Sequence, residues 1–288
     1  MICKSYAKVN LFLYVLGKRD DGYHELYTLM HKIDFFDYIE INKTSKYSID
    51  IKTNIKELNN QDNLAYKAAS LFFDKAKIKP QVKIEIEKNI PMGGGLGGGS
   101  SNAAYTLLTL NKLFEFPLSE KEIYDISCLI GSDVPFFLCK KPSAIAKGKG
   151  EILQEIDCNT TNHQIFLAIP RINISTAYIY SQYSKLLLTT GKPINKMPFV
   201  ISGGRCELEK IKQHLCNDLE EVALSRFKEL KNLKSVLVKY FGNALLSGSG
   251  ASMFSITNPE VKAEEGIEEL LVSEGIFCKT VNFADEGR

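Results

Sequence analysis

One glycine-rich stretch, residues 91–101, constrains this chain more than any other part of its sequence. It reads PMGGGLGGGSS, so six of its eleven residues are glycine. Ordering so flexible a segment costs backbone entropy, and a folded protein that keeps it must have a use for it. The use that we expect is to bring backbone N–H groups close to an anion at the start of a helix. Unpaired donors and the helix dipole both favour negative charge there.

The segments on either side of this stretch are predicted to be a strand and a helix. Before it, Val82, Ile84 and Ile86 alternate with charged residues, which is the period of a strand with one solvated face. After it, apolar residues recur at near-helical spacing from Ala103 to Phe114. A strand, a glycine loop and a helix that follow one another in this order are typical of phosphate-binding sites.

Two common types of phosphate-binding loop fit this stretch poorly. Residues 93–98 satisfy the GxGxxG pattern of dinucleotide-binding proteins, but a loop so rich in glycine matches it by chance. The strand before the loop is also amphipathic, whereas the first strand of a dinucleotide-binding fold is buried on both faces. A P-loop needs a lysine after its last glycine, and here Gly99 is followed by Ser100 and Ser101. A disordered linker is disfavoured because a helix is predicted to begin directly after the serines.

The composition of the whole chain indicates an ordinary globular protein. Its 288 residues suffice for one large domain or two fused ones, and 44% of them are hydrophobic and 24% charged. The net charge is +2, with acidic and basic residues interleaved, so a nucleic-acid-binding or polybasic membrane surface is not expected. Apolar runs are too short to span a membrane, and the first residues lack the apolar core of a signal peptide. We therefore expect a cytoplasmic protein with no membrane, nucleic-acid or protein partner.

The seven cysteines and four histidines show no metal-binding or disulfide pattern. No Cys-x-x-Cys pair occurs, and no histidine stands at zinc-ligand spacing from a cysteine pair. We expect the cysteines to be reduced and mostly buried.

The remaining patterns predict an α+β fold with strands in meanders and helices grouped between them. Helices are predicted to start near residue 62, to cover 119–130 and 261–271, and to occur two or three times in 207–241. Strands are predicted over 4–17, 37–42, 47–53, 165–169 and 276–281, and hairpins over 143–156 and 245–254, whereas 182–205 is predicted to be a surface loop. Two sheets would give one domain over residues 1–150 and another over 151–288, with a cleft at their junction.

Two polar positions outside the loop are candidates for chemistry. Lys8 and Asn10 lie on the same face of the first predicted strand, about 6–7 Å apart. A lysine in a strand is more often a solvated edge residue, but here an asparagine and two aromatics share its face. Asp133 follows a helix end at Gly131 and precedes Pro135, so it could be simply the N-cap of the next helix. The same position would also keep the carboxylate ionised, as a base or cation ligand requires.

Three motifs together resemble the superfamily of galactokinase, homoserine kinase, mevalonate kinase and phosphomevalonate kinase. Residues 91–101 are similar to its phosphate-binding motif, PxGxGLGxGSS. Residues 5–11, SYAKVNL, are similar to its first motif, although Tyr6 replaces the usual proline. Residues 246–251, LSGSGA, are similar to its third motif, a second glycine turn that supports the first. The resemblance implies a two-domain small-molecule kinase with its active site in a cleft between the domains.

Further segments resemble one branch of this superfamily, whose members phosphorylate the tertiary C2 hydroxyl of a cytidylyl sugar alcohol. These segments are residues 17–24 (GKRDDGYH), 92–104 and 131–137 (GSDVPFF). The resemblance implies an ATP-dependent reaction of the non-mevalonate isoprenoid route. Beyond residues 217–224 and 247–254, the carboxy-terminal half matches only loosely. A homoserine or mevalonate kinase, a non-catalytic nucleotide-binding module and an NAD-dependent oxidoreductase remain as alternatives.

The resemblance also implies roles for single residues. Asp133 matches the catalytic base that accepts the proton of the attacking hydroxyl, and Lys8 matches a lysine that stabilises the hydroxyl or the transferred phosphoryl group. Mg²⁺ is expected to bridge the phosphates, with the hydroxyl of Ser101 on its side, and no acidic ligand can be assigned. The expected ATP-binding residues are Pro91, Met92, Gly93, Gly94, Gly95, Leu96, Gly97, Gly98, Gly99, Ser100 and Ser101 of the loop and Asn63, Leu64 and Lys88 at the adenine.

For the cytidylyl substrate, the resemblance implies an aromatic sandwich around the base. Tyr23 and Tyr180 match the stacking positions, His24 matches the position that reads the base, and Asn10 would lie near the erythritol. Thr176 completes the expected substrate-binding set. For Tyr180, packing of a helix into the core is the alternative interpretation.

Overall fold

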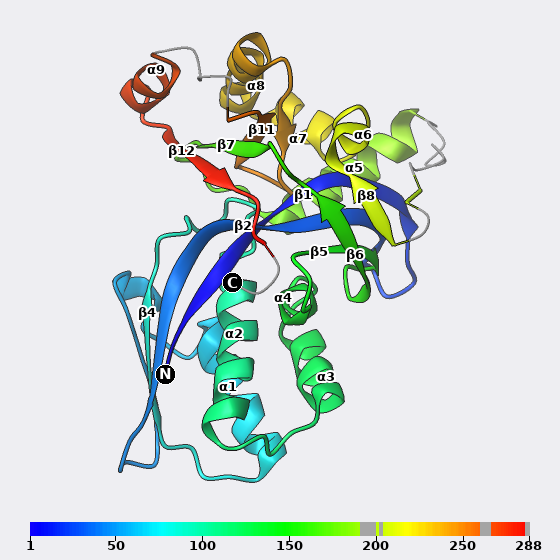
Figure 1. Ribbon diagram of the computed structural model, residues 1–288. Helices are drawn as coiled ribbons and strands as arrows, with labels where there is room; N and C mark the ends of the chain where they lie inside the picture. Colours follow the sequence, from blue (N-terminus) through cyan, green and yellow to red (C-terminus); the bar gives the residue numbers. More distant parts are fainter. Residues whose placement is uncertain (191–199, 202–203, 260–265, 286–288) are drawn as a thin grey trace. The chain divides into compact units, whose positions relative to one another are not determined.

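A computed structural model describes residues 1–190, 200–201, 204–259 and 266–285, and it confirms the α+β class (Figure 1). The chain forms two compact units. Unit 1 contains residues 1–7, 35–91 and 97–139, and unit 2 contains residues 8–34, 92–96 and 140–288. Both units are discontinuous in sequence, because strands β1 (Ile2–Lys18) and β2 (His24–Lys43) and the glycine loop each contribute to both. The assignment of domains to residues 1–150 and 151–288 stays a prediction.

Unit 1 combines strands with a group of helices. Strand β4 (Val82–Glu87) pairs in parallel with β3 (Ile49–Thr53) and antiparallel with residues 38–43 of β2. A 3₁₀ turn η1 (Lys56–Leu58) follows β3, and the helices are α1 (Leu64–Ala76), α2 (Gly98–Leu113), α3 (Glu120–Ile130) and α4 (Val134–Leu138). Helix α2 packs against α1, α3 and α4, and these helices lie side by side in Figure 1.

Local sequence explains where two of these helices begin. The side chain of Asn63 accepts a hydrogen bond from the backbone N–H of Ala65, 2.9 Å away, and so caps α1, close to the predicted helix start near residue 62. Ser119 and Glu122 form a capping box at the start of α3. Helix α2 begins differently, because its N-cap is Gly97, which has a φ of 71° and no side chain to offer.

Unit 2 contains two sets of paired strands. Residues 26–31 of β2 pair antiparallel with β5 (Ser143–Gly148), which pairs with β6 (Ile152–Asn159), and β6 pairs in parallel with β8 (Arg205–Glu207). Strand β1 pairs in parallel with β9 (Cys216–Asn217). A four-stranded sheet has the order β10 (Leu245–Leu246), β11 (Met253–Thr257), β7 (Gln164–Ile169) and β12 (Phe277–Asn282).

Unit 2 also contains helices, most of which contribute residues to a hydrophobic core. They are α5 (Thr176–Thr190), α6 (Leu208–Lys212), α7 (Glu220–Arg226), α8 (Lys228–Phe241) and α9 (Ile267–Ser273). The core includes Leu13 of β1, Phe166 of β7, Ile179 of α5 and Leu233 of α8. Helix α8 lies against β11, as Figure 1 shows.

Most predicted elements are confirmed, but one has different bounds and another was wrong. The strand predicted over 37–42 is only the end of β2, which runs for 20 residues. Residues 182–190 belong to α5 and not to a loop. The prediction failed because the polar residues, glycine and proline of 182–205 were taken to indicate a loop over the whole segment. Residues 5–15 of β1 are buried on both faces, which excludes the alternative interpretation of Lys8 as a solvated edge lysine. Residues 191–199, 202–203 and 261–265, which also carried predictions, lie outside the described residues.

The prediction that the cysteines are reduced and mostly buried was also wrong, because the five free cysteines are only partly buried and the other two are joined. Cys158 of β6 lies opposite Cys206 of β8 in the parallel register, with Cα atoms 4.7 Å apart, and the two form a disulfide. The sequence could not indicate this pair, because it depends on the pairing of two strands 48 residues apart. Within the described ranges, no helix is both long and apolar enough to cross a membrane.

Candidate active site

The first half of the glycine loop, residues 92–96, lies against the second glycine turn, residues 247–252, within unit 2. A Cβ atom on Gly95, whose φ is +72°, would stand 2.0 Å from the carbonyl oxygen of Ser247, so only glycine fits there. Three hydrogen bonds join the two segments: Ala251 N to Gly93 O (3.2 Å), Ser252 N to Gly94 O (3.1 Å) and Ser247 Oγ to Gly95 O (3.1 Å). The second turn therefore braces the first, as the resemblance implied.

Lys8 and Asn10 lie beside this pair of turns. The backbone N–H of Lys8 donates to the carbonyl of Leu96 over 2.9 Å, and its Nζ donates to Asn10 Oδ1 over 2.7 Å. Asn10 in turn donates to the hydroxyl of Thr28 over 2.9 Å. A Cβ atom on Gly248 would lie 3.5 Å from Lys8 Nζ, so the ammonium faces the second turn. The lysine is 3% exposed and held in place, which suits a group that acts on a bound phosphate.

The second half of the loop starts helix α2 in unit 1. Gly97 has no side chain that could accept hydrogen bonds from the backbone N–H groups of the first turn. These donors therefore have no side-chain cap, as is typical of a helix end that binds an anion. A Cβ atom on Gly98 would lie 3.3 Å from Lys88 Nζ, and one on Gly99 would lie 3.5 Å from Leu64 Cδ1. The structure thus brings Leu64 and Lys88, two of the expected ATP-binding residues, to the first turn of α2.

A cavity of about 460 Å³ opens next to Leu64, and Lys67, Leu129 and Ile130 also line it. It lies between the start of α1 and the end of α3. Asn63 has a structural role besides the expected one, because its carboxamide caps α1 and donates to the carbonyl of Leu58 over 3.0 Å.

Ser101, the residue expected on the metal side, is completely buried. Its hydroxyl oxygen lies 2.7 Å from that of Ser5 in β1, at hydrogen-bond distance. The hydroxyl is therefore already part of a buried contact, and its role as a metal ligand stays a prediction.

Asp133 occupies the N-cap position of α4, as predicted, but its side chain makes no capping hydrogen bond. Pro135 lies in the first turn, and the turn before α4 is closed by the bond from Val134 N to Gly131 O, 3.1 Å long. Helix capping therefore does not account for a carboxylate at this position. Asp133 belongs to unit 1 and Lys8 to unit 2.

The expected substrate-binding residues fall into separate groups of unit 2. The ring of His24 stacks on that of Tyr180, with centroids 5.0 Å apart and planes inclined by 29°. Burial, with a smaller effect of Lys18, lowers the pKa of His24, which keeps its imidazole neutral near pH 7. Tyr23 instead lies on the surface, 55% exposed, with Lys149 Nζ 4.8 Å from its ring centroid.

Thr176 begins α5 and lies at the second glycine turn. Its hydroxyl oxygen is 2.8 Å from that of Ser249. The structure therefore groups Thr176 with the turn that Lys8 and Asn10 also face.

Several buried polar residues of these sites were missed in the sequence. The Oδ1 atom of Asn217 accepts a hydrogen bond from Leu219 N over 3.0 Å. Its Nδ2 also donates to the carbonyls of Leu246 and Gly248, over 2.8 and 2.7 Å, and so supports the second glycine turn. Asp37 and Asn102 were missed too, although a charged residue directly after two phenylalanines was a usable signal.

Comparisons with known proteins agree with this arrangement. Residues 63–141 match the N-terminal domain of GHMP kinases, and residues 207–275 match the C-terminal domain. The crystal structure of Methanococcus jannaschii mevalonate kinase is 17% identical and superimposes with a TM-score of 0.71, covering 99% of this chain and 98% of the other. The fold and the paired glycine turns thus define a small-molecule kinase of the GHMP class.

Relatives with a higher sequence identity identify the family within this class to which the chain belongs. The 4-diphosphocytidyl-2-C-methyl-D-erythritol kinase of Sulfurihydrogenibium sp. (strain YO3AOP1) is 39% identical over 92% of this chain and 94% of the relative. That of Clostridioides difficile (strain 630) is 38% identical over 93% and 90%. A crystal structure of a 4-(cytidine 5'-diphospho)-2C-methyl-D-erythritol kinase is 30% identical, with a TM-score of 0.75 and coverage of 98% and 99%. The chain belongs to the family of 4-diphosphocytidyl-2-C-methyl-D-erythritol kinases.

Proposed function

We propose that this protein transfers the γ-phosphoryl group of ATP to the C2 hydroxyl of 4-diphosphocytidyl-2-C-methyl-D-erythritol. The products are the 2-phosphate of that compound and ADP, in the non-mevalonate route to isoprenoid precursors. The observation that carries the proposal is the buried Lys8, held by Asn10 beside two glycine turns, in a chain similar to these kinases over nearly its full length. A buried lysine beside glycine turns suits the binding and transfer of phosphate.

Two side chains would act on the reacting groups. Asp133 would accept the proton of the C2 hydroxyl, and general-base help of this kind contributes on the order of 10²–10⁴-fold. Lys8 would stabilise the negative charge on the transferred phosphoryl group. The backbone N–H groups at the start of α2 and in residues 92–96 would hold the β- and γ-phosphates, since these segments are the two halves of the glycine loop.

Mg²⁺ is proposed as the metal of the reaction. No group of three or more His, Cys, Asp or Glu side chains that could hold a metal occurs within the described ranges. Mg²⁺ does not require a dedicated group of protein ligands, because it is usually bound by nucleotide phosphates and water with one or two protein ligands. When bound, the ion would neutralise phosphate charge. The hydroxyl oxygen of Ser101 would join the ligands of the ion through a lone pair while its O–H donates to Ser5.

The cytidylyl end of the substrate would bind in unit 2. The neutral His24, stacked on Tyr180, is suited to reading a base by hydrogen bonds, and the exposed ring of Tyr23 is suited to stacking on it. Asn10 and Thr176 would lie near the sugar alcohol, because both lie at the second glycine turn. We also propose that the protein acts in the cytoplasm on this small molecule, without a nucleic-acid or protein partner.

An assay of ADP release tests the proposal and its alternatives together. ADP formation with the cytidylyl substrate, and not with homoserine or mevalonate, is the expected result. Activity restricted to homoserine or mevalonate would assign the chain to another kinase of the class. ATP binding without any turnover would indicate a non-catalytic module, and a melting temperature raised by NAD but not by ATP would indicate an oxidoreductase.

A further inference from the structure

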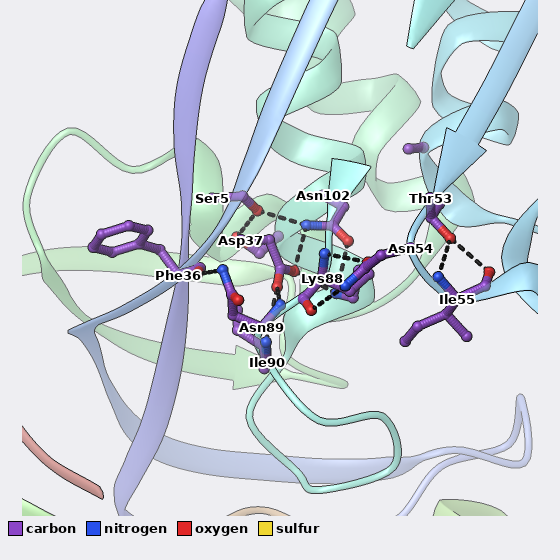
Figure 2. Close-up of polar contacts among 12 residues, drawn as sticks. Ser5, Phe36, Asp37, Thr53, Asn54, Ile55, Lys88, Asn89, Ile90 and Asn102 are labelled. Carbon is purple, nitrogen blue, oxygen red and sulfur yellow. Dashed lines mark hydrogen bonds and ion pairs between the residues drawn. The ribbon is translucent and has the colours of Figure 1, made fainter. Parts of the chain in front are cut away.

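A cluster of buried polar side chains lies next to the first turns of α2 in unit 1. Its members, the Asp37 cluster, are Ser5, Asp37, Lys88 and Asn102 (Figure 2). Asp37 is fully buried, and the side chain of Lys88 is only 4% exposed. Burying a charge away from water is costly unless the charge is paired and hydrogen-bonded. The partners of Asp37 and Lys88 therefore determine whether this cluster is stable.

Both carboxylate oxygens of Asp37 are used. Oδ1 accepts from the backbone N–H groups of Asn89 and Ile90, over 2.7 and 2.8 Å. Oδ2 accepts from Lys88 Nζ and from Asn102 Nδ2, the latter over 2.8 Å. One carboxylate thus binds both the segment just before the glycine loop, at Asn89 and Ile90, and helix α2 just after it, at Asn102.

Asn102 connects this carboxylate to the rest of the cluster. Its Oδ1 accepts from Lys88 Nζ over 2.9 Å, and its Nδ2 also donates to Ser5 Oγ over 2.9 Å. Ser5 Oγ lies 2.7 Å from the hydroxyl of Ser101. The bonds therefore continue from Asp37 into the first turns of α2, as the dashed lines of Figure 2 show for Asp37, Asn102 and Ser5.

Lys88 is fixed at both of its ends. The side chain of Asn54 accepts from Lys88 N over 2.7 Å and donates to Lys88 O over 3.0 Å, so the backbone is held from one side. The ammonium is held by Asp37 and Asn102, and it lies 3.3 Å from the point where a Cβ atom on Gly98 would stand. A positive charge therefore lies directly beside the first turn of α2.

That positive charge depends on Asp37. Burial lowers the pKa of Lys88, and the Asp37 carboxylate opposes this effect both as a charge and as a hydrogen-bond acceptor. Without the carboxylate, burial would favour the neutral amine. The charge beside the phosphate-binding helix end would then be weakened, and Asn102 would lose the acceptor that holds it.

We propose that Asp37 is a positioning residue for the nucleotide: it fixes Lys88 and, through Asn102, the first turns of α2 and the segment entering the glycine loop. The inference rests on the proposed function only in taking the nucleotide to be ATP. Asp37 itself touches no substrate. Its loss weakens ATP binding while the cytidylyl substrate, whose proposed residues belong to unit 2, binds as before.

The principal test is Asp37→Asn. Asparagine keeps an acceptor for the N–H groups of Asn89 and Ile90 but cannot accept from both Lys88 and Asn102. Titration calorimetry with ATP and steady-state kinetics with each substrate are measured on protein whose circular dichroism is unchanged. We expect the Kd and KM for ATP to rise by about ten-fold or more, the size of a lost charge-assisted hydrogen bond. The KM for the cytidylyl substrate should stay within about two-fold of the wild type, since it depends on other residues.

A second variant decides the question if Asp37→Asn does not fold. Asn102→Ala leaves the Asp37–Lys88 pair in place and removes the hydrogen bonds by which the α2 carboxamide contacts Asp37, Lys88 and Ser5. We expect its ATP affinity to fall by about five-fold, a smaller effect because the charge stays paired. The matched control is Asp125→Asn, which removes a carboxylate paired with Lys121 on the exposed face of α3 and should leave ATP binding unchanged.

The inference fails if the folded variants bind ATP as tightly as the wild type. It also fails if the KM values for both substrates rise equally, because a merely structural role predicts that. A wild-type protein that binds ATP but does not phosphorylate the cytidylyl substrate would overturn the proposed function, whereas the ATP titrations would still decide the role of Asp37. A wild-type protein that does not bind ATP would overturn both.

Discussion

Lys8 donates a hydrogen bond from its ammonium to Asn10 Oδ1, 2.7 Å away, and each of the two residues is only 3% exposed. The carboxamide of Asn10 is itself held by Thr28, whose hydroxyl donates to the carbonyl of Phe12 over 2.6 Å. A long, flexible lysine is therefore fixed before any substrate arrives. Fixed charges of this kind cost no reorganisation when the phosphoryl group is transferred.

The first prediction concerns this lysine. Lys8→Met keeps the length and apolar stem of the side chain but removes its charge, so kcat should fall by about 100-fold or more, as for other lost charge stabilisers. The assay is ADP release at saturating ATP and cytidylyl substrate. Lys83→Met is the control, because Lys83 lies in a strand but is paired with Glu85 at a half-exposed position. Near-normal turnover in Lys8→Met would exclude a direct role for this ammonium.

The second prediction separates the two interpretations of Asp133. Asn is as good an N-cap as Asp, and the Asp133 side chain makes no capping bond, so Asp133→Asn should not lower the melting temperature. If Asp133 is the general base, kcat should nevertheless fall by about 100-fold or more. Thermal unfolding and ADP release on the same preparation measure both quantities. A lowered melting temperature with normal turnover would favour the structural interpretation.

Local patterns predicted the glycine loop, its flanking elements and most helix starts. The second glycine turn at residues 247–252 was found through a resemblance, and its contact with residues 92–96 is confirmed. Contacts between distant residues were not predictable in the same way. The burial of Lys8 depends on both faces of β1 being covered, and no property of residues 4–17 alone reveals that. The Asp37–Lys88 pair joins residues 51 positions apart and depends on the register of β2 and β4.

The third prediction concerns Asn217, whose contacts were likewise not evident in the sequence. Asn217→Ala leaves the carbonyls of Leu246 and Gly248 without their buried donor, which should cost about 2 kcal/mol of unfolding free energy. The melting temperature should fall by roughly 4–8 °C. Because the loosened turn braces the glycine loop, the KM for ATP should rise as well.

Asn282→Ala is the control for this experiment, since its partner contact with Gln164 is exposed. It should leave both the melting temperature and the KM for ATP unchanged. Equal behaviour of the two variants would show that Asn217 does not support the turn.

The last prediction concerns pH and the buried His31 of unit 2. Its Nδ1 donates to the carbonyl of Lys32 over 2.7 Å, whereas its Nε2 is buried with no hydrogen-bond partner among the described residues. Burial lowers the pKa of His31 to about 4, although the hydrogen bond to the Lys32 carbonyl raises this pKa in part. The charge of Lys32 lowers the pKa further, and that of Asp285 raises it. The unfolded chain therefore takes up this proton below pH 6.5, and the folded protein only near pH 4. The stability that the neutral ring contributes is complete above pH 6.5 and is lost as the pH falls toward 4.

Urea unfolding at pH 7 and pH 5 measures this loss. The free energy of unfolding of the wild type should decrease between these pH values by about 2 kcal/mol more than that of His31→Gln, which cannot take up the proton. Comparing the decreases, rather than the absolute stabilities, removes any packing cost of the substitution itself. Equal decreases in the wild type and His31→Gln would mean that the folded protein protonates this ring without penalty, contrary to its burial against Phe283.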